Sequence, residues 1–105
     1  MFLESKITYL LDLIDYQKDS IISRIILDKK NGSITFFAFD EGQKLSEHTA
    51  PFDAMVYIMD GEVSITISDK SSNLKAGDMI ILPANEPHAL KAIKKFKMIL
   101  IMIHS

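Results

Sequence analysis

Residues 54–68, AMVYIMDGEVSITIS, decide the fold. Two runs rich in apolar and β-branched residues flank Asp60-Gly61, a pair typical of tight hairpin turns. The second run alternates strictly between apolar and polar side chains, as a strand with one buried face does. The stretch therefore predicts a β-hairpin. In its first strand Val56 and Ile58 are expected to point inward and Tyr57 outward.

The same pattern continues on both sides of this hairpin. Ser20–Asp28 and Ser33–Phe39 flank Asn31-Gly32, where we expect a second tight turn with positive φ at both central residues. Asp69–Asn73 is polar and predicts a turn. Further strands are expected at Met79–Leu82, His88–Ala92 and Phe96–Ile103.

Ile7–Tyr16 is the stretch that favours a short helical turn, because Leu10, Leu11 and Ile14 would share one face of a helix. Seven or eight short strands at a spacing of roughly 8 to 12 residues favour a sandwich or small barrel. With 105 residues, the chain has material for a single core. We therefore expect one all-β domain over residues 1–105.

Composition excludes several function classes. The chain has no cysteine, which rules out disulfides, cysteine zinc sites and thiol nucleophiles. The net charge of −2 gives no electrostatic reason to expect nucleic acid. The longest apolar run, Met98–Ile103, is far shorter than the roughly 18 to 20 residues of a membrane span. With charged residues interrupting the N-terminal stretch, these features favour a cytoplasmic protein.

Two stretches, residues 42–61 and 77–88, resemble the two motifs of the cupin family. The residues that match are Gly42, His48, Gly61, Gly77, Pro83 and His88. The resemblance implies a double-stranded β-helix, the jelly-roll barrel, usually dimeric and with a pocket inside. Within the family the chain is most similar to small single-domain bacterial cupins of unassigned function.

The chain departs from the family pattern at three positions. Ala50 stands where the first motif has its second histidine, and Ala54 stands at the position of its glutamate. Asn85 replaces a glycine of the second motif, a mild change because asparagine also accepts a left-handed backbone. The alanines matter more, since a methyl group has no lone pair for a metal. His48 and His88 are left as the metal-binding residues.

We therefore expect a small molecule to bind in a pocket lined by His48, Ala50, Ala54, Val56 and His88. The two histidines would form a degenerate metal site that holds a divalent transition metal weakly, such as zinc, nickel, manganese or iron. No cofactor follows with certainty from these residues.

Two other functions remain open. A metal-dependent enzyme, of the isomerase or oxygenase type, would use His48, His88 and Asp53, if a kink at Pro51-Phe52 turned Asp53 inward as a third ligand. A non-catalytic regulatory or partner-binding module would use the outer face of the barrel instead.

Several other residues carry expectations of their own. An outward Tyr57 between Met55 and Met59 would make an apolar face, and we expect a second copy of the chain to cover it in a homodimer. Glu47 is expected to point outward, and His104 to be exposed near the chain end. The lysines near the last turn are expected to be solvated; they are Lys91, Lys94, Lys95 and Lys97.

Overall fold

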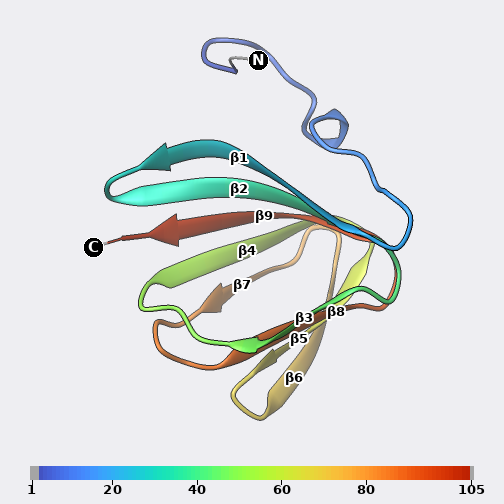
Figure 1. Cartoon of the computed structure of the whole chain (residues 1–105), viewed down its shortest axis with the longest axis vertical. Helices are drawn as coiled ribbons and strands as arrows, with labels where there is room; N and C mark the ends of the chain where they lie inside the picture. Colours follow the sequence, from blue (N-terminus) through green and yellow to red (C-terminus); the bar gives the residue numbers. More distant parts are fainter. Residues whose placement is uncertain (1–2, 105) are drawn as a thin grey trace.

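The computed structural model describes residues 3–104, and most of them form β-strands (Figure 1). The elements in chain order are a 3-10 turn η1 (Leu10–Asp12) and the strands β1 (Ile21–Lys29), β2 (Gly32–Phe39), β3 (Lys44–His48), β4 (Asp53–Asp60), β5 (Glu62–Ile67), β6 (Lys70–Lys75), β7 (Met79–Leu82), β8 (His88–Ala92) and β9 (Phe96–Ile103). Within residues 3–104, the structure has no helix long and apolar enough to cross a membrane.

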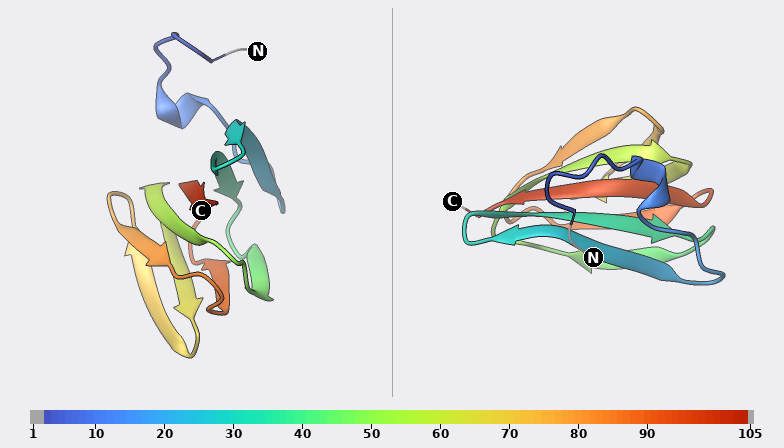
Figure 2. Two further views of the ribbon diagram at one scale, coloured as in Figure 1. Left: turned by 90° about the vertical axis from the view of Figure 1, so that its left-hand side faces the viewer. Right: turned by 90° about the horizontal axis from the view of Figure 1, so that it is seen from above.

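The strands form two antiparallel sheets that face each other. One sheet has the order β1-β2-β9-β4-β7 and the other the order β3-β8-β5-β6. Figures 1 and 2 show the two layers, with the N-terminal segment on the outer side of the five-stranded sheet. This arrangement confirms the expected all-β jelly-roll barrel with a short N-terminal helical turn.

The central hairpin is confirmed, and its glycine is required. Gly61, between β4 and β5, has φ +80°, and a Cβ there would lie 1.8 Å from the Lys95 carbonyl oxygen. The upstream hairpin differs from the prediction by one residue, because its turn is Lys30–Asn31 and Gly32 already belongs to β2. Neither Asn31 nor Gly32 has a positive φ. Glycine serves another purpose at position 32, since a Cβ would lie 2.9 Å from the Met102 carbonyl oxygen on β9.

One prediction of local structure was wrong. The polar stretch Asp69–Asn73, expected as a turn, lies largely in β6, an edge strand paired with β5 that buries Leu74. An edge strand contributes one face to the core, so its composition can be mostly polar. The short helical turn predicted within Ile7–Tyr16 is present as η1, in which Leu10 is 46% exposed.

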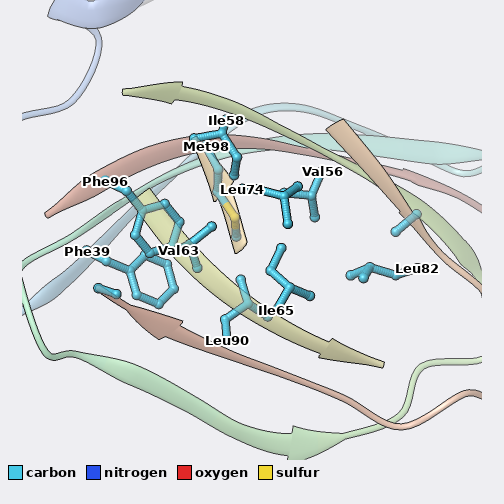
Figure 3. Close-up of a cluster of buried hydrophobic side chains, with 12 residues drawn as sticks. Phe39, Val56, Ile58, Val63, Ile65, Leu74, Leu82, Leu90, Phe96 and Met98 are labelled. Atoms are coloured by element: carbon cyan, nitrogen blue, oxygen red, sulfur yellow. The ribbon is translucent and has the colours of Figure 1, made fainter. Parts of the chain in front are cut away.

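The core fills the space between the sheets at one end of the barrel (Figure 3). Phe39 and Phe96 stack there with ring centroids 4.5 Å apart. Val56 and Ile58 are fully buried in the same core while Tyr57 lies on the outer face, which confirms the alternation predicted for β4. The aromatic pair closes this end, so any interior space must lie toward the other end.

Lys97 corrects the expectation of a solvated lysine cluster. Its side chain is 7% exposed, and its Nζ donates a hydrogen bond to the Leu11 carbonyl oxygen at 2.6 Å. The same Nζ lies 5.0 Å from the centre of the Tyr16 ring. A buried ammonium needs such partners. Lys97 therefore attaches the N-terminal segment to β9.

Candidate functional site

A partly enclosed cavity of about 210 Å³ lies between the two sheets, away from the stacked phenylalanines. All five residues expected to line a pocket are around it, namely His48, Ala50, Ala54, Val56 and His88. Both sheets contribute to the wall, because β3 and β8 supply the histidines while β4 supplies Ala54 and Val56. As ligand-binding residues, these five stay a prediction.

A β-bulge in β3 turns His48 toward the cavity. Leu45 pairs with Leu90 of β8, and His48 pairs with His88, so three steps along β3 match two steps along β8. The extra residue shifts the alternation by one position. His48 therefore joins Leu45 on the inner face, whereas plain alternation from Leu45 would have placed Glu47 there. Glu47 is exposed, as expected.

The two imidazole rings meet directly. His48 Nε2 and His88 Nε2 are 3.1 Å apart, and the ring planes are inclined at 69°. His88 is 7% exposed, whereas His48 lies on the solvent side of the pair. The pair thus forms the polar end of the cavity.

Backbone carbonyls orient both rings. His48 Nδ1 donates to the Ser46 carbonyl oxygen at 2.8 Å, and His88 Nδ1 donates to the Glu86 carbonyl oxygen at 3.2 Å. A carbonyl oxygen can only accept, so each neutral ring carries its proton on Nδ1 and a lone pair on Nε2. Burial lowers the pKa of His88 below its usual value, and the nearby His48 lowers it further, against the opposing effect of the Glu86 carbonyl.

Asp53 does not join the two histidines. It lies on the exposed side of β4, in uninterrupted register with Ile103, and its carboxylate accepts a hydrogen bond from the Ala84 backbone N–H at 2.8 Å. No kink at Pro51-Phe52 turns it inward, because Ala54 keeps the inward position. Within residues 3–104, no group of three His, Asp or Glu side chains is placed to hold a metal.

Hydrogen bonds between loops hold the mouth of the cavity. Asn85 has φ +66°, as expected for the residue that replaces a glycine, and its N–H donates to the Ala50 carbonyl oxygen at 2.7 Å.

His104 was expected to be exposed, but it is half-buried, with its ring centroid 4.3 Å from that of Phe52. Its N–H donates to the Asn31 carbonyl oxygen, which fixes the end of β9.

Most of the cavity wall was missed by the sequence interpretation. The additional lining residues are apolar: Phe37, Leu45, Phe52, Leu82, Leu90, Met98, Leu100 and Met102. Several are cross-strand partners of predicted residues, since Ala54 pairs with Leu82 and Met102, and Val56 pairs with Leu100. The inward alternation of β4 was the available signal. The sequence pattern does not contain the strand order, which places β7 and β9 on either side of β4.

The distance between the two Nε2 atoms suits a shared metal ion, but two protein ligands are fewer than metal sites in enzymes use. Two imidazole ligands with metal–nitrogen bonds of about 2.0 to 2.1 Å lie roughly 2.9 to 3.4 Å apart at octahedral to tetrahedral angles. The observed 3.1 Å is within that range. Catalytic zinc sites and iron oxygenase sites use about three protein ligands. Because the described residues supply two, we derive no chemical step through a metal here.

Comparisons with known structures find the same barrel in several proteins. A conserved protein of unknown function from Streptococcus pyogenes superposes with a TM-score of 0.92 and 34% sequence identity, over 96% of this chain and 89% of that one. A cupin superfamily protein from Desulfitobacterium hafniense superposes with a TM-score of 0.91 and 26% identity, over 97% of this chain and 94% of that one.

A cupin 2 conserved barrel domain protein from Leptotrichia buccalis is 37% identical, with a TM-score of 0.87, over 90% of this chain and 46% of that one. A search of curated proteins found no match. The family Cupin_2, described as a cupin domain, matches residues 35–104, which is more than half of the sequence. The chain therefore belongs to the cupin family.

Proposed function

We propose that this cupin binds a small molecule in the cavity between its sheets, beside a degenerate metal site made of His48 and His88. The observation that supports this proposal most strongly is the meeting of the two Nε2 atoms at one end of a preformed cavity of about 210 Å³. Ala50 and Ala54 face the same space with methyl groups, which leaves room for a ligand where chelating side chains would otherwise lie. A cytoplasmic location remains part of the proposal.

A cavity-filling variant tests ligand binding. Ala54 is buried on the inner face of β4, so Ala54→Leu should fill part of the cavity, whereas Ala89→Leu adds the same atoms on the outer face of β8. We expect members of a general fragment library to shift the methyl NMR signals of Leu90 and Met98 in the wild type and in Ala89→Leu. In Ala54→Leu these shifts should be lost. If no fragment shifts them in the wild-type protein, the proposal is wrong.

The metal part of the proposal has its own test. With two imidazole donors, we expect divalent metal to be bound below one equivalent and to be removed by dialysis against a mild chelator. His48→Ala should abolish even this binding. One tightly held equivalent of a transition metal in protein purified without a histidine tag would instead favour the metal-dependent isomerase or oxygenase.

We also propose that two copies associate through the outer face of the five-stranded sheet. Cross-strand pairing aligns one apolar row over all five strands, in the order Ile81, Met55, Ile101, Ile34 and Leu27. The next row is Met79, Tyr57, Ile99, Phe36 and Arg24. The N-terminal segment covers one part of this face, but Met79 and Ile81 are each 48% exposed.

The accessible surface of the chain is larger than that of a compact monomer of its mass. A compact monomer of 11.9 kDa has an accessible surface of about 5,950 Å². This chain exposes 6725 Å². Part of this excess comes from the N-terminal segment, where Ile7 and Tyr9 are exposed, and part from the uncovered apolar residues Met79 and Ile81. A regulatory module that docks a different protein on this face is the competing possibility.

A further inference from the structure

The cavity wall has a marked division between apolar and polar groups. Thirteen side chains line it, and among them the nitrogen-bearing ones are His48 and His88, at one end. The rest are hydrocarbon or thioether, and Phe37 and Phe52 contribute aromatic rings. A ligand with hydroxyl groups all around, such as a sugar, would leave most of them without a partner here. Each buried hydrogen-bonding group without a partner disfavours binding several-fold or more.

The cavity volume limits the size of the occupant. A cavity of roughly 150 Å³ lined by aliphatic and aromatic side chains is large enough for benzene. Pockets for drug-sized ligands span roughly 300 to 1,000 Å³. At about 210 Å³, this cavity suits a single ring with one or two small substituents, or a short branched chain.

The hydrogen-bond roles of the histidines restrict the head group of such a ligand. Both Nδ1–H groups already donate to the carbonyl oxygens of Ser46 and Glu86. What each neutral ring presents at Nε2 is therefore an acceptor. Two acceptors 3.1 Å apart repel each other unless something with a hydrogen or a positive charge lies close to both. A ligand that donates an O–H hydrogen to Nε2 relieves this conflict.

We infer that the cavity takes a small, largely hydrocarbon molecule with one acidic O–H head group, either a phenol or a carboxylic acid. This inference rests on the proposed binding function. The body of the ligand lies against Leu90, Met98 and Leu100, and its head reaches the Nε2 atoms. A phenol donates its O–H hydrogen to an imidazole Nε2. A carboxylic acid is ionised in neutral solution, so it takes up one proton from water as it binds, and that hydrogen lies between its oxygen and Nε2. No covalent bond to the protein forms. A sugar or a nucleotide is excluded as the occupant by the apolar wall.

Matched probes test this inference on the metal-free protein. Toluene, p-cresol and p-toluic acid share one apolar body, and the last two add a hydroxyl and a carboxyl group, while D-glucose represents the polyols. Titrations followed by the methyl signals of Leu90 and Met98 give each affinity. We expect p-cresol, p-toluic acid or both to bind roughly five- to tenfold more tightly than toluene. This affinity ratio corresponds to the net contribution of about one hydrogen bond. D-glucose should not bind at millimolar concentration.

Replacement of the head-group partner completes the test. In His88→Leu, and separately in His48→Leu in case the first variant folds poorly, the advantage of the O–H probes over toluene should fall to less than about twofold. Binding of D-glucose at these methyl groups in preference to toluene would overturn the inference but leave the proposed function standing. Equal affinity of toluene and both O–H probes in the wild type would also overturn it. If no probe or library fragment binds, the proposed function fails as well.

Discussion

At the scale of single residues, Gly61 and Gly77 provide a matched pair of substitutions. Both have positive φ, but a Cβ at Gly61 would collide with the Lys95 carbonyl oxygen at 1.8 Å, whereas a Cβ at Gly77 meets nothing within 4 Å. Gly77→Ala should therefore lower the free energy of unfolding by the backbone strain alone, about 1 to 2 kcal/mol. Gly61→Ala adds the collision and should lower it by about 3 kcal/mol or more.

Urea denaturation measures both effects. If Gly61→Ala were no more destabilising than Gly77→Ala, the close approach of the β8–β9 loop to the β4–β5 turn would be wrong.

His88 should make stability depend on pH. Its pKa is lowered in the folded protein, chiefly by burial, so over part of the acid range the unfolded chain binds a proton that the folded chain does not. Stability is then greatest above the ordinary pKa of 6.5 and is lost as the pH falls toward the folded pKa. We expect the unfolding free energy of the metal-free protein to decrease from about pH 7.5 to about pH 5.5, and less steeply in His88→Leu. Parallel curves for the two proteins would contradict this prediction.

The sequence allowed the residues at one end of the cavity to be predicted but not the reason they meet. Motif spacing placed His48, His88 and Ala54, and the alternation of β4 placed Val56. The bulge that turns His48 rather than Glu47 inward depends on pairing with β8, which lies 40 residues away along the chain. The same limit applies to Asp53, because its contact with the Ala84 N–H joins the start of β4 to the loop after β7, which no local pattern connects.

At the scale of elements, the segment before β1 is held to the barrel by polar contacts. The Tyr16 hydroxyl donates to Asp60 Oδ2 at 2.6 Å, and both burial and this carboxylate raise the pKa of Tyr16. Arg24 Nη1 donates to the Leu13 carbonyl oxygen, and Lys97 donates to that of Leu11. These contacts fix residues 11–16 on the outer face without a regular helix.

Removal of one contact should loosen this segment without unfolding the barrel. Tyr16→Phe deletes the hydrogen bond to Asp60 and should lower the unfolding free energy by about 1 to 2 kcal/mol. Amide hydrogen exchange in residues 10–16 should become faster, with the core strands β4 and β9 less affected. Tyr9→Phe is the control, because Tyr9 is 67% exposed and its loss of a hydroxyl should change neither quantity. Equal effects of both substitutions would show that the Asp60 contact does not hold the segment.

Elements with apolar alternation were predictable, and those stabilised by their neighbours were not. β4, β5 and β9 combine β-branched residues with clear turn signals, so their bounds differ from prediction by at most one residue. β6 is polar because it is an edge strand, and it exists through its pairing with β5. The helical turn predicted within Ile7–Tyr16 is present as η1, but the contacts that hold this segment to β9 and β4 could not be predicted from its local pattern.

At the scale of the whole molecule, the apolar outer face bears directly on assembly. Because each copy would present the same rows, a two-fold dimer places Met79 and Ile81 of one copy against the same face of its partner. Wild-type protein at tens of micromolar should therefore have twice the 11.9 kDa chain mass by light scattering. A mass of one chain under these conditions would overturn the proposed dimer and leave the face for a different partner.

A charge at Ile81, the exposed end of the first apolar row on the edge strand β7, should separate the copies. Ile81→Glu would bury a carboxylate in the interface, and removing such a charge from water costs several kcal/mol, so we expect a monomer. The side chain is 48% exposed in the single chain, so the barrel itself should still fold. Ile25→Glu is the matched control, since Ile25 is an isoleucine of the same sheet that is 65% exposed but lies outside both apolar rows. It should leave the dimer intact, because its carboxylate stays in water; dissociation by both substitutions would place the interface elsewhere.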